Sequence, residues 1–190
     1  MLAAAEKLMV KREGEDFTLV EVAKVGRVSI GSIYHRFSSK DALIHAVHTR
    51  VIDRLNIEQQ MILKRVCGGK HDLDEFTGLF VEEFAEMLMR FAPVLRPLMV
   101  RAPRDPFMHN VGSEAYQQFA DRVKEQLLLY RDEFGRPDHE RMVTSVYRVI
   151  YATLARYLGL GSSSEASDGG DWVELKQDLG RMCAAFLRAH

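Results

Sequence analysis

Three helix-start signals lie between residues 18 and 41, and their close spacing is the strongest constraint on the fold. Thr18 and Glu21 have the spacing of a capping box, in which the threonine oxygen caps a helix amide and the glutamate caps the threonine amide. Ser29 can cap a second short helix. Ser38–Asp41 matches another capping box, at the start of a longer helix. Such starts do not fit β-strands, so we predict two short helices joined by a tight turn and then a long helix.

Helical periodicity extends over most of the remaining chain. An apolar stripe runs from Leu2 to Met9, and Gly14 is placed to end that first helix. Further along, the expected helices cover about 38–68, 72–91, 113–134, 138–160 and 172–189. Four prolines are expected to break the chain into short helical pieces and turns: Pro93, Pro97, Pro103 and Pro106. Residues 161–171 have loop composition and are expected to be mobile.

These elements predict an all-α protein with two parts. A three-helix head containing a helix-turn-helix covers residues 1–48, and a helical-bundle body covers residues 49–190. The chain has 190 residues, 47% of them hydrophobic, which is enough to bury a sizeable core. Residues 1–50 hold eight Lys and Arg against six Asp and Glu, and no acidic residue lies between residues 26 and 40. This local basic surface suits a polyanion, although charge alone fits a solvated helix face equally well.

Cysteine usage and hydropathy predict a cytoplasmic protein. Cys67 and Cys183 are far apart and lack metal-ligand spacing, as is typical of reduced thiols. No apolar run reaches the roughly 18 residues that a membrane span requires. The charged N-terminus does not resemble a signal peptide. We therefore expect no membrane contact, no metal and no cofactor.

The short helix after Ser29 has the features of a DNA-reading element. Burial of Ile33 and Phe37 against neighbouring helices would leave an outward face made of Ile30, Gly31, Ser32, His35 and Arg36. Gly31 costs roughly 1 kcal/mol relative to alanine in a helix, a choice that close approach to DNA would justify. A short turn before such a helix lets its N-terminal residues enter the major groove.

The run VSIGSIYHRFSSKDAL, residues 28–43, resembles the signature of the TetR family of transcriptional regulators. In that family, V-S-x-G-(T/S)-(L/I)-Y-x-x-F-x-(S/N)-K-(E/D)-x-L spans the recognition helix and the start of the next helix. Residues 3–8, Gly14, Thr18 and Val22–Ala23 also match the first two helices of the family. The resemblance covers roughly residues 2–50. It implies an α-helical homodimer that binds a palindromic operator, usually as a repressor released by a small-molecule ligand.

The resemblance also implies roles for single residues. Thr18, Tyr34 and Lys40 match positions that contact the DNA backbone. The positions nearest the base edges correspond to Ile30, Gly31, Ser32 and His35. Serine can serve several bases there, whereas isoleucine offers only apolar contact. The full set of predicted DNA-binding residues is Thr18, Arg27, Ser29, Ile30, Gly31, Ser32, Tyr34, His35, Arg36 and Lys40.

Two features depart from the family pattern. The family usually has Ala-Gly before the valine, where this chain has Gly26 and Arg27. We expect Arg27 to take the left-handed conformation that glycine normally fills, unless Gly26 shifts the turn; its side chain could then gain a phosphate contact. The second departure is that no basic arm precedes the first helix, so either the natural start lies upstream or this additional DNA grip is absent.

Aromatic and methionine side chains of the body are candidates for a ligand cavity, because flexible and flat groups suit adaptable pockets; core packing is the alternative for each. These candidates are Phe84, Met87, Phe91, Met99, Phe107, Tyr116, Phe119, Tyr147 and Tyr151. An anionic ligand group could be held by Arg101, Arg104, His109 and Arg148, or these residues could simply be exposed. The amphipathic helices at 138–160 and 172–189 could pair with their copies across a two-fold axis or pack only within one chain.

Two other classes of function stay open. A degenerate family member could sense a ligand or scaffold a partner without specific DNA binding, given the turn at Gly26-Arg27. A helical enzyme or metal protein is the other class. However, His45 and His48 have no carboxylate or thiol cluster to complete a metal site, and no nucleophile, nucleotide or metalloprotease motif occurs. We predict a regulator without enzymatic activity, with double-stranded DNA, a second copy of itself and a small-molecule effector as partners.

Overall fold

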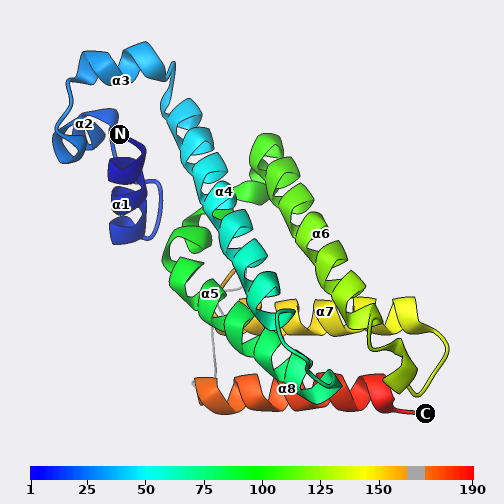
Figure 1. Cartoon of the computed structure of the whole chain (residues 1–190). Helices are drawn as coiled ribbons and strands as arrows, with labels where there is room; N and C mark the ends of the chain where they lie inside the picture. The colour runs from blue at the N-terminus through cyan, green and yellow to red at the C-terminus, as the bar shows by residue number, and fades with distance from the viewer. Residues whose placement is uncertain (162–169) are drawn as a thin grey trace.

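The computed structural model describes residues 1–161 and 170–190, and all regular structure in these ranges is helical (Figure 1). The α-helices are α1 (Leu2–Arg12), α2 (Leu19–Gly26), α3 (Ile30–Arg36), α4 (Lys40–Val66), α5 (Leu73–Arg101), α6 (Pro106–Leu128), α7 (His139–Tyr157) and α8 (Trp172–Arg188). Two short 3-10 helices, η1 (Ala102–Arg104) and η2 (Arg131–Glu133), follow α5 and α6. The predicted all-α fold, with a helix-turn-helix head and a helical body, is confirmed.

Helices α1–α3 form the head at one end of the molecule, and α4 leads from the head into the body (Figure 1). The capping box of Thr18 and Glu21 is present at the start of α2. Ser29 caps α3, because its Oγ accepts the amide of Ser32 at 3.0 Å. The predicted boundary between residues 48 and 49 falls inside α4, which is continuous there.

Two helix ends differ from the prediction by one residue. Helix α4 is capped by Ser39, whose Oγ accepts the amide of Ala42, so the expected box at Ser38–Asp41 is wrong. Phe37 is buried in an extended conformation, and Ser39, also extended, precedes the first helical residue, Lys40. At the end of α1, the left-handed residue is Glu13, with φ 51°, and not the glycine that follows it.

Helix α5 is longer than predicted, because Pro93 and Pro97 lie inside it instead of ending it. Each proline removes one helical hydrogen bond. Burial of the surrounding apolar residues offsets this loss, since Val94, Leu95 and Leu98 all pack in the body core. The expected break at these two prolines is therefore wrong.

Helix α6 begins earlier than the predicted residue 113. Asp105 caps it by accepting the amide of Met108 at 3.3 Å, and Pro106 fills the first helical position, where the missing amide is harmless. The helix ends at Leu128, before the predicted residue 134, and a turn with η2 leads on to α7.

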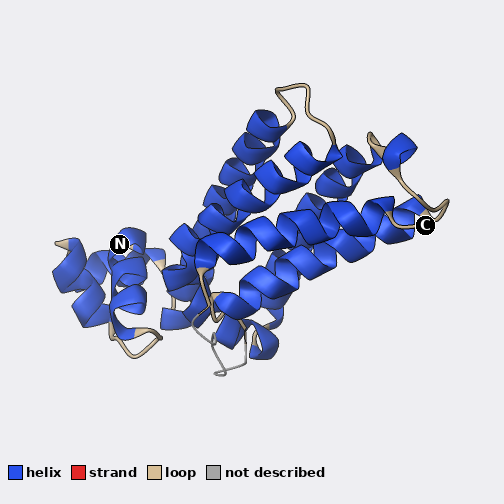
Figure 2. Cartoon of the chain, turned by 90° about the horizontal axis from the view of Figure 1, so that it is seen from below, coloured by secondary structure: helices blue, strands red, loops and turns tan. Residues whose placement is uncertain are grey.

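Helices α7 and α8 lie at the end of the body away from the head, with α8 packed on α5 (Figures 1 and 2). At this crossing, a Cβ added to Gly180 would come 3.1 Å from the Cα of Gly78, so the two helices approach closely. Phe76, Phe80 and Phe84 are fully buried along α5 and form the centre of the core. Helices α4–α8 packed in this way form the body, and the head lies at its other end.

Part of the predicted mobile loop, residues 162–169, lies outside the described residues. Within the described ranges, no helix has the length and hydropathy that crossing a membrane requires. The same ranges contain no group of three or more side chains suited to holding a metal ion.

Candidate functional site

Helix α3 has one side in the head core and the other in solvent. Ile33 is completely buried, and Phe37, which follows the helix, is buried as well. The other residues of the helix are exposed: Ile30, Gly31, Ser32, Tyr34, His35 and Arg36. We call this exposed set the α3 face. All the residues of this helix that the sequence pointed to as DNA contacts are therefore exposed.

The first turn of α3 carries small side chains. A Cβ added to Gly31 would approach only Ser29 Oγ, at 3.9 Å, so packing within the head does not require glycine. Small hydroxyl groups border this turn, because the Oγ atoms of Ser29 and Ser32 lie 2.8 Å apart. A glycine that costs roughly 1 kcal/mol in a helix, without a packing reason, is consistent with close approach by a partner.

The turn before α3 is made by Arg27. Its φ of 51° and ψ of 44° are the left-handed conformation expected from the sequence. The Val28 amide donates to the Ala23 carbonyl at 3.0 Å and so closes the end of α2. A Cβ on Gly26 would lie 3.4 Å from Ala4 Cβ, which shows that this glycine serves the contact between α2 and α1. The Arg27 side chain is exposed.

Two predicted backbone contacts, Thr18 and Lys40, are engaged within the head. Thr18 Oγ1 accepts the Glu21 amide at 3.2 Å, and the Glu21 carboxylate accepts the Thr18 amide at 2.8 Å. That amide is the largest of the contacts that lower the pKa of Glu21 to about 2. The Lys40 ammonium donates to the Glu15 carbonyl and lies 4.7 Å from the centre of the Phe17 ring. DNA would have to draw Lys40 away from these partners.

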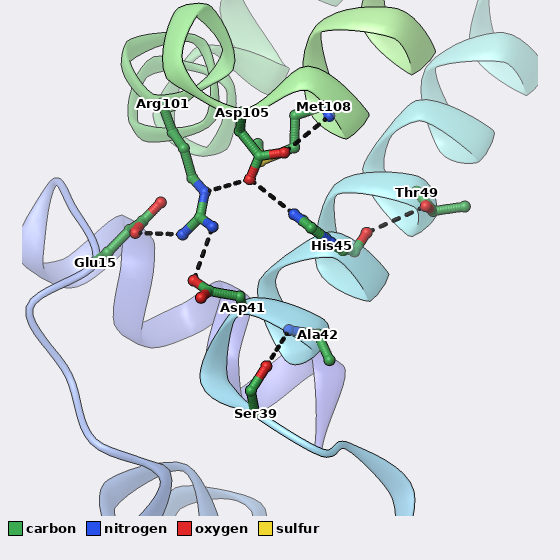
Figure 3. A network of polar contacts seen from close by, with 9 residues as sticks. All are labelled: Glu15, Ser39, Asp41, Ala42, His45, Thr49, Arg101, Asp105 and Met108. Carbon is green, nitrogen blue, oxygen red and sulfur yellow. Dashed lines mark hydrogen bonds and ion pairs between the residues drawn. The ribbon is translucent and has the colours of Figure 1, made fainter.

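A cluster of five side chains connects the head to the body (Figure 3). Arg101, at the end of α5, donates to Glu15 before α2 and to Asp41 in α4, each at 2.8 Å. Its Nε donates to Asp105 at 2.8 Å, and Asp105 lies 2.7 Å from His45 Nε2 of α4. We call these five residues the junction network. It ties the segment between α5 and α6 to the head and to the first turns of α4.

Opposite charges hold the junction network together. Burial opposes the charge of Arg101, but hydrogen bonds to Asp41, Asp105 and Glu15 raise its pKa above the ordinary value. Burial likewise opposes the charge of Asp105, but hydrogen bonds from His45 and Arg101 lower its pKa below the usual range. Both groups are therefore ionised at neutral pH.

A cavity of about 430 Å³ lies in the body between α4, α5, α6 and α7. Cavities of roughly 300–1,000 Å³ with mostly apolar walls commonly bind small molecules. Met99 near the end of α5 and Ala102 in η1 line it, as do Met108 and His109 in the first turn of α6. Because Arg101 and Asp105 lie in the same segment, residues 99–109, the cavity and the junction network share one piece of the chain.

The predicted ligand residues fall into two groups. Those that line the cavity are Phe84, Met99, Tyr116, Tyr147 and Tyr151. Those that do not line it are Met87, Phe91, Phe107 and Phe119. Met87 and Phe119 are core residues, and Phe91 is buried under the Arg54 guanidinium, 5.3 Å from the ring centre. Phe107 stacks on His45 beside the junction network, with the ring centres 4.6 Å apart.

The head also matches a known family. Residues 1–47 match the family model described as "Bacterial regulatory proteins, tetR family". A protein of Mycolicibacterium smegmatis, named HTH-type transcriptional repressor KstR2, is 27% identical over 158 residues, which make up 80% of this chain and 73% of that protein. These matches support a TetR-family head and a TetR-family transcriptional regulator as the nearest description of this chain. The chain is a transcriptional regulator with a DNA-binding helix-turn-helix head.

Solved structures with the same fold extend over the whole chain. A protein described as a TetR-family transcriptional regulator of Mesorhizobium loti has a TM-score of 0.76 at 15% identity, covering 98% of this chain and 92% of that one. The fatty acid degradation regulator FadR from Bacillus halodurans has a TM-score of 0.71 at 13% identity, covering 100% of this chain and 95% of that one. At these identities the likeness shows the TetR fold in both head and body.

Most polar residues of the cavity were not among the predicted ligand residues. They are His48, Asn56, Gln59, Ser113 and Gln117. On α4 and α6 these polar residues follow the same helical spacing as the apolar lining residues, so they share one inward face. Polar residues at such spacing on an apolar face were the sequence signal that could have indicated a cavity. Of the residues considered for an anionic group, His109 lines the cavity, whereas Arg101, Arg104 and Arg148 do not.

Proposed function

We propose that this TetR-family regulator is a homodimeric repressor that binds a palindromic operator through α3 and is released when a small molecule enters the body cavity. The α3 face carries the proposal, because it is exposed, free of acidic residues and slim at its first turn. Repression is supported by the similar M. smegmatis protein, which is named a repressor.

The α3 face would make two kinds of contact. Ser32 and His35 carry hydrogen-bonding groups for base edges, and Ile30 offers an apolar surface for a thymine methyl group. Gly31 would let the backbone approach closely. The proposed contacts with phosphates are Thr18, Arg27, Ser29, Tyr34, Arg36 and Lys40. Phosphate contacts position the head, whereas the base-edge contacts would select the operator.

Helices α7 and α8 are the proposed dimer interface. Met182 on α8 is 65% exposed and Val149 on α7 is 49% exposed, although both are large and apolar. Two such helices from each subunit can form a four-helix bundle around a two-fold axis. The same axis would set the two α3 helices about 34 Å apart, or a multiple of that distance, to match successive turns of DNA.

Effector release would act through residues 99–109. A ligand that displaces Met99 or Met108 from the cavity wall also displaces the chain that carries Arg101 and Asp105. These two residues hold the head through Glu15 and the start of α4. A ligand that binds one arrangement of this segment more tightly than another therefore shifts the balance between head positions.

Selection of bound DNA from random sequence tests the proposed function. We expect enrichment of an inverted repeat whose half-sites are centred about 10 base pairs apart or a multiple of that spacing. A variant with both Ser32→Glu and Arg36→Glu is the matched control and should enrich nothing, because its added negative charge repels phosphates. If the unmodified chain enriches no sequence, the proposal fails in favour of a family member that senses a ligand without specific DNA binding.

A further inference from the structure

We propose that the body cavity binds an uncharged, largely apolar molecule that carries a hydroxyl or carbonyl oxygen, and that His48 recognises this oxygen. The inference rests on the proposed function, because it names the chemical class of effector for the same cavity. Three properties of the wall carry it: the absence of charge, a histidine without a hydrogen-bond partner, and neutral tyrosines.

The described residues that line the cavity include no Asp, Glu, Lys or Arg. Arg101 is nearby in the chain, but three carboxylates of the junction network engage it. Arg104 and Arg148 are exposed and lie off the wall. An ionised carboxylate or phosphate in the cavity would lose its hydration without gaining a counter-ion, which strongly opposes binding. The wall therefore selects against charged ligands.

Among the described residues of the wall, His48 is a buried polar group without a hydrogen-bond partner. It projects from α4, lines the cavity and is only 5% exposed. Its Nδ1 is buried without a hydrogen bond, and Nε2 has no hydrogen bond to any described residue. A Cβ added to Gly112 would lie 3.9 Å from Nε2, so the missing side chain leaves room there for a ligand atom. Buried polar groups rarely stay unpaired, and an oxygen bound beside Nε2 would give the imidazole a hydrogen-bond partner.

The imidazole of His48 is neutral at pH 7. Burial lowers its pKa, with Asp105 acting in the opposite direction and His45 acting in the same direction. A neutral imidazole has one donor and one acceptor nitrogen. It can therefore pair with a hydroxyl or a carbonyl, but it supplies no positive charge for a carboxylate.

Three tyrosines complete the uncharged wall. The ring centre of Tyr116 lies 5.5 Å from that of Tyr147 and 4.9 Å from that of Tyr151. Burial raises the pKa of Tyr147 and of Tyr151, so both hydroxyls stay protonated. Flat rings with neutral hydroxyls suit an apolar alcohol or ketone.

Displacement of a fluorescent probe from the full chain tests the selectivity. N-phenyl-1-naphthylamine is an uncharged probe of apolar cavities, and decanol and decanoate are competitors of equal chain length that differ in charge. At about pH 7.5 we expect decanol to displace the probe at concentrations at least about tenfold lower than decanoate. Equal or stronger displacement by decanoate would overturn the proposal, and so would failure of the probe to bind.

Substitution of His48 tests the recognition of oxygen. His48→Phe keeps a flat ring but removes both nitrogens, so decanol should bind about fivefold more weakly while the affinity for the probe changes by less than about twofold. His48→Gln keeps a donor and an acceptor and should retain most of the decanol affinity. His71→Phe, outside the cavity, is the matched control. Loss of decanol binding in both His48 variants, or in neither, would refute the role of His48.

Selection of DNA without any ligand separates this inference from the proposed function. An enriched inverted repeat together with preferential binding of decanoate would overturn the inference and leave the DNA-binding proposal intact. Preferential binding of decanol without an enriched sequence would support the ligand class and overturn the proposed function.

Discussion

Arg101 reaches carboxylates from three separate parts of the chain: Glu15 before α2, Asp41 in α4 and Asp105 before α6. Its side chain is mostly shielded from solvent, so these pairs are less screened than ordinary surface ion pairs. These ion pairs join the end of α5 to the segment before α2 and to α4, in addition to the packing of α5 against α1. The junction network therefore stabilises the contact between head and body, and it is the proposed route by which a bound ligand would affect the head.

Arg101→Met keeps the length of the side chain but leaves three carboxylates close together without their cation. We expect the free energy of unfolding to fall by about 2 kcal/mol, because hydrogen bonds to charged groups are lost and the acids repel one another. Urea denaturation measures this loss. Arg104→Met removes an exposed arginine from the same segment and should change stability by less than about 0.5 kcal/mol. Equal effects of the two substitutions would contradict the role of Arg101.

Single residues of the α3 face should separate affinity from specificity. Tyr34→Phe removes one hydroxyl and should weaken binding to every DNA sequence by a similar factor, about three- to tenfold. Ser32→Ala should instead change which base is preferred at one position of each half-site. Binding to a panel of operator variants distinguishes the two patterns. A uniform loss in Ser32→Ala would show that Ser32 does not face a base.

At the scale of elements, the crossing of α5 and α8 depends on two glycines that act differently. Gly180 faces the backbone of α5, with Gly78 Cα 3.1 Å from the place of an added Cβ. A Cβ on Gly78 itself would meet nothing within 4 Å. Beside this crossing, Lys176 of α8 is buried and bonded to Glu82 and Glu86 of α5, and the Glu86 contact lowers the pKa of that carboxyl. Close packing and ion pairs thus fix the same interface.

The two glycines make a matched pair of substitutions. Gly78→Ala should raise the free energy of unfolding by up to about 1 kcal/mol, because alanine favours a helix and meets no obstacle. Gly180→Leu should lower it by about 1–3 kcal/mol, since the larger side chain pushes α8 away from α5. Thermal and urea denaturation give both values. Stabilisation by Gly180→Leu would show that the crossing is looser than described.

At the scale of the whole molecule, the head and the proposed dimer interface lie at opposite ends (Figure 1). The cavity and the junction network lie between them, on α4, α5, α6 and α7. A two-fold axis through α7 and α8 would therefore determine how far apart the two heads lie, although the heads are remote from the axis. Small changes in the angle of α4 would then alter how both heads fit one operator.

Met182→Glu places a charge on the most exposed part of the apolar face of α8. We expect a folded monomer in size-exclusion chromatography with light scattering, and operator binding weakened by at least about tenfold through loss of the second half-site. Leu129→Glu, at another apolar residue that is 74% exposed, is the control and should stay dimeric. A dimer that survives Met182→Glu would argue against the α7–α8 interface.

Features of the head that depend on residues close together in the chain could be predicted before the fold was known. Capping of α2 by Thr18 and of α3 by Ser29 joins groups only three residues apart, so spacing alone revealed both. The composition of the α3 face could be read for the same reason. The left-handed turn at Arg27 was expected from the resemblance to the family pattern, in which glycine fills this position.

Features that join distant segments became visible only when the helices were packed together. Helix α5 continues through Pro93 and Pro97 because packing offsets the lost hydrogen bonds, which no local rule shows. Arg101 and Glu15 are 86 residues apart, and only the path of α5 brings them together. Helical periodicity marks an inward face but does not separate core from cavity, since both bury apolar side chains. The angles at which the helices cross determine which of these buried residues line the cavity and which pack in the core.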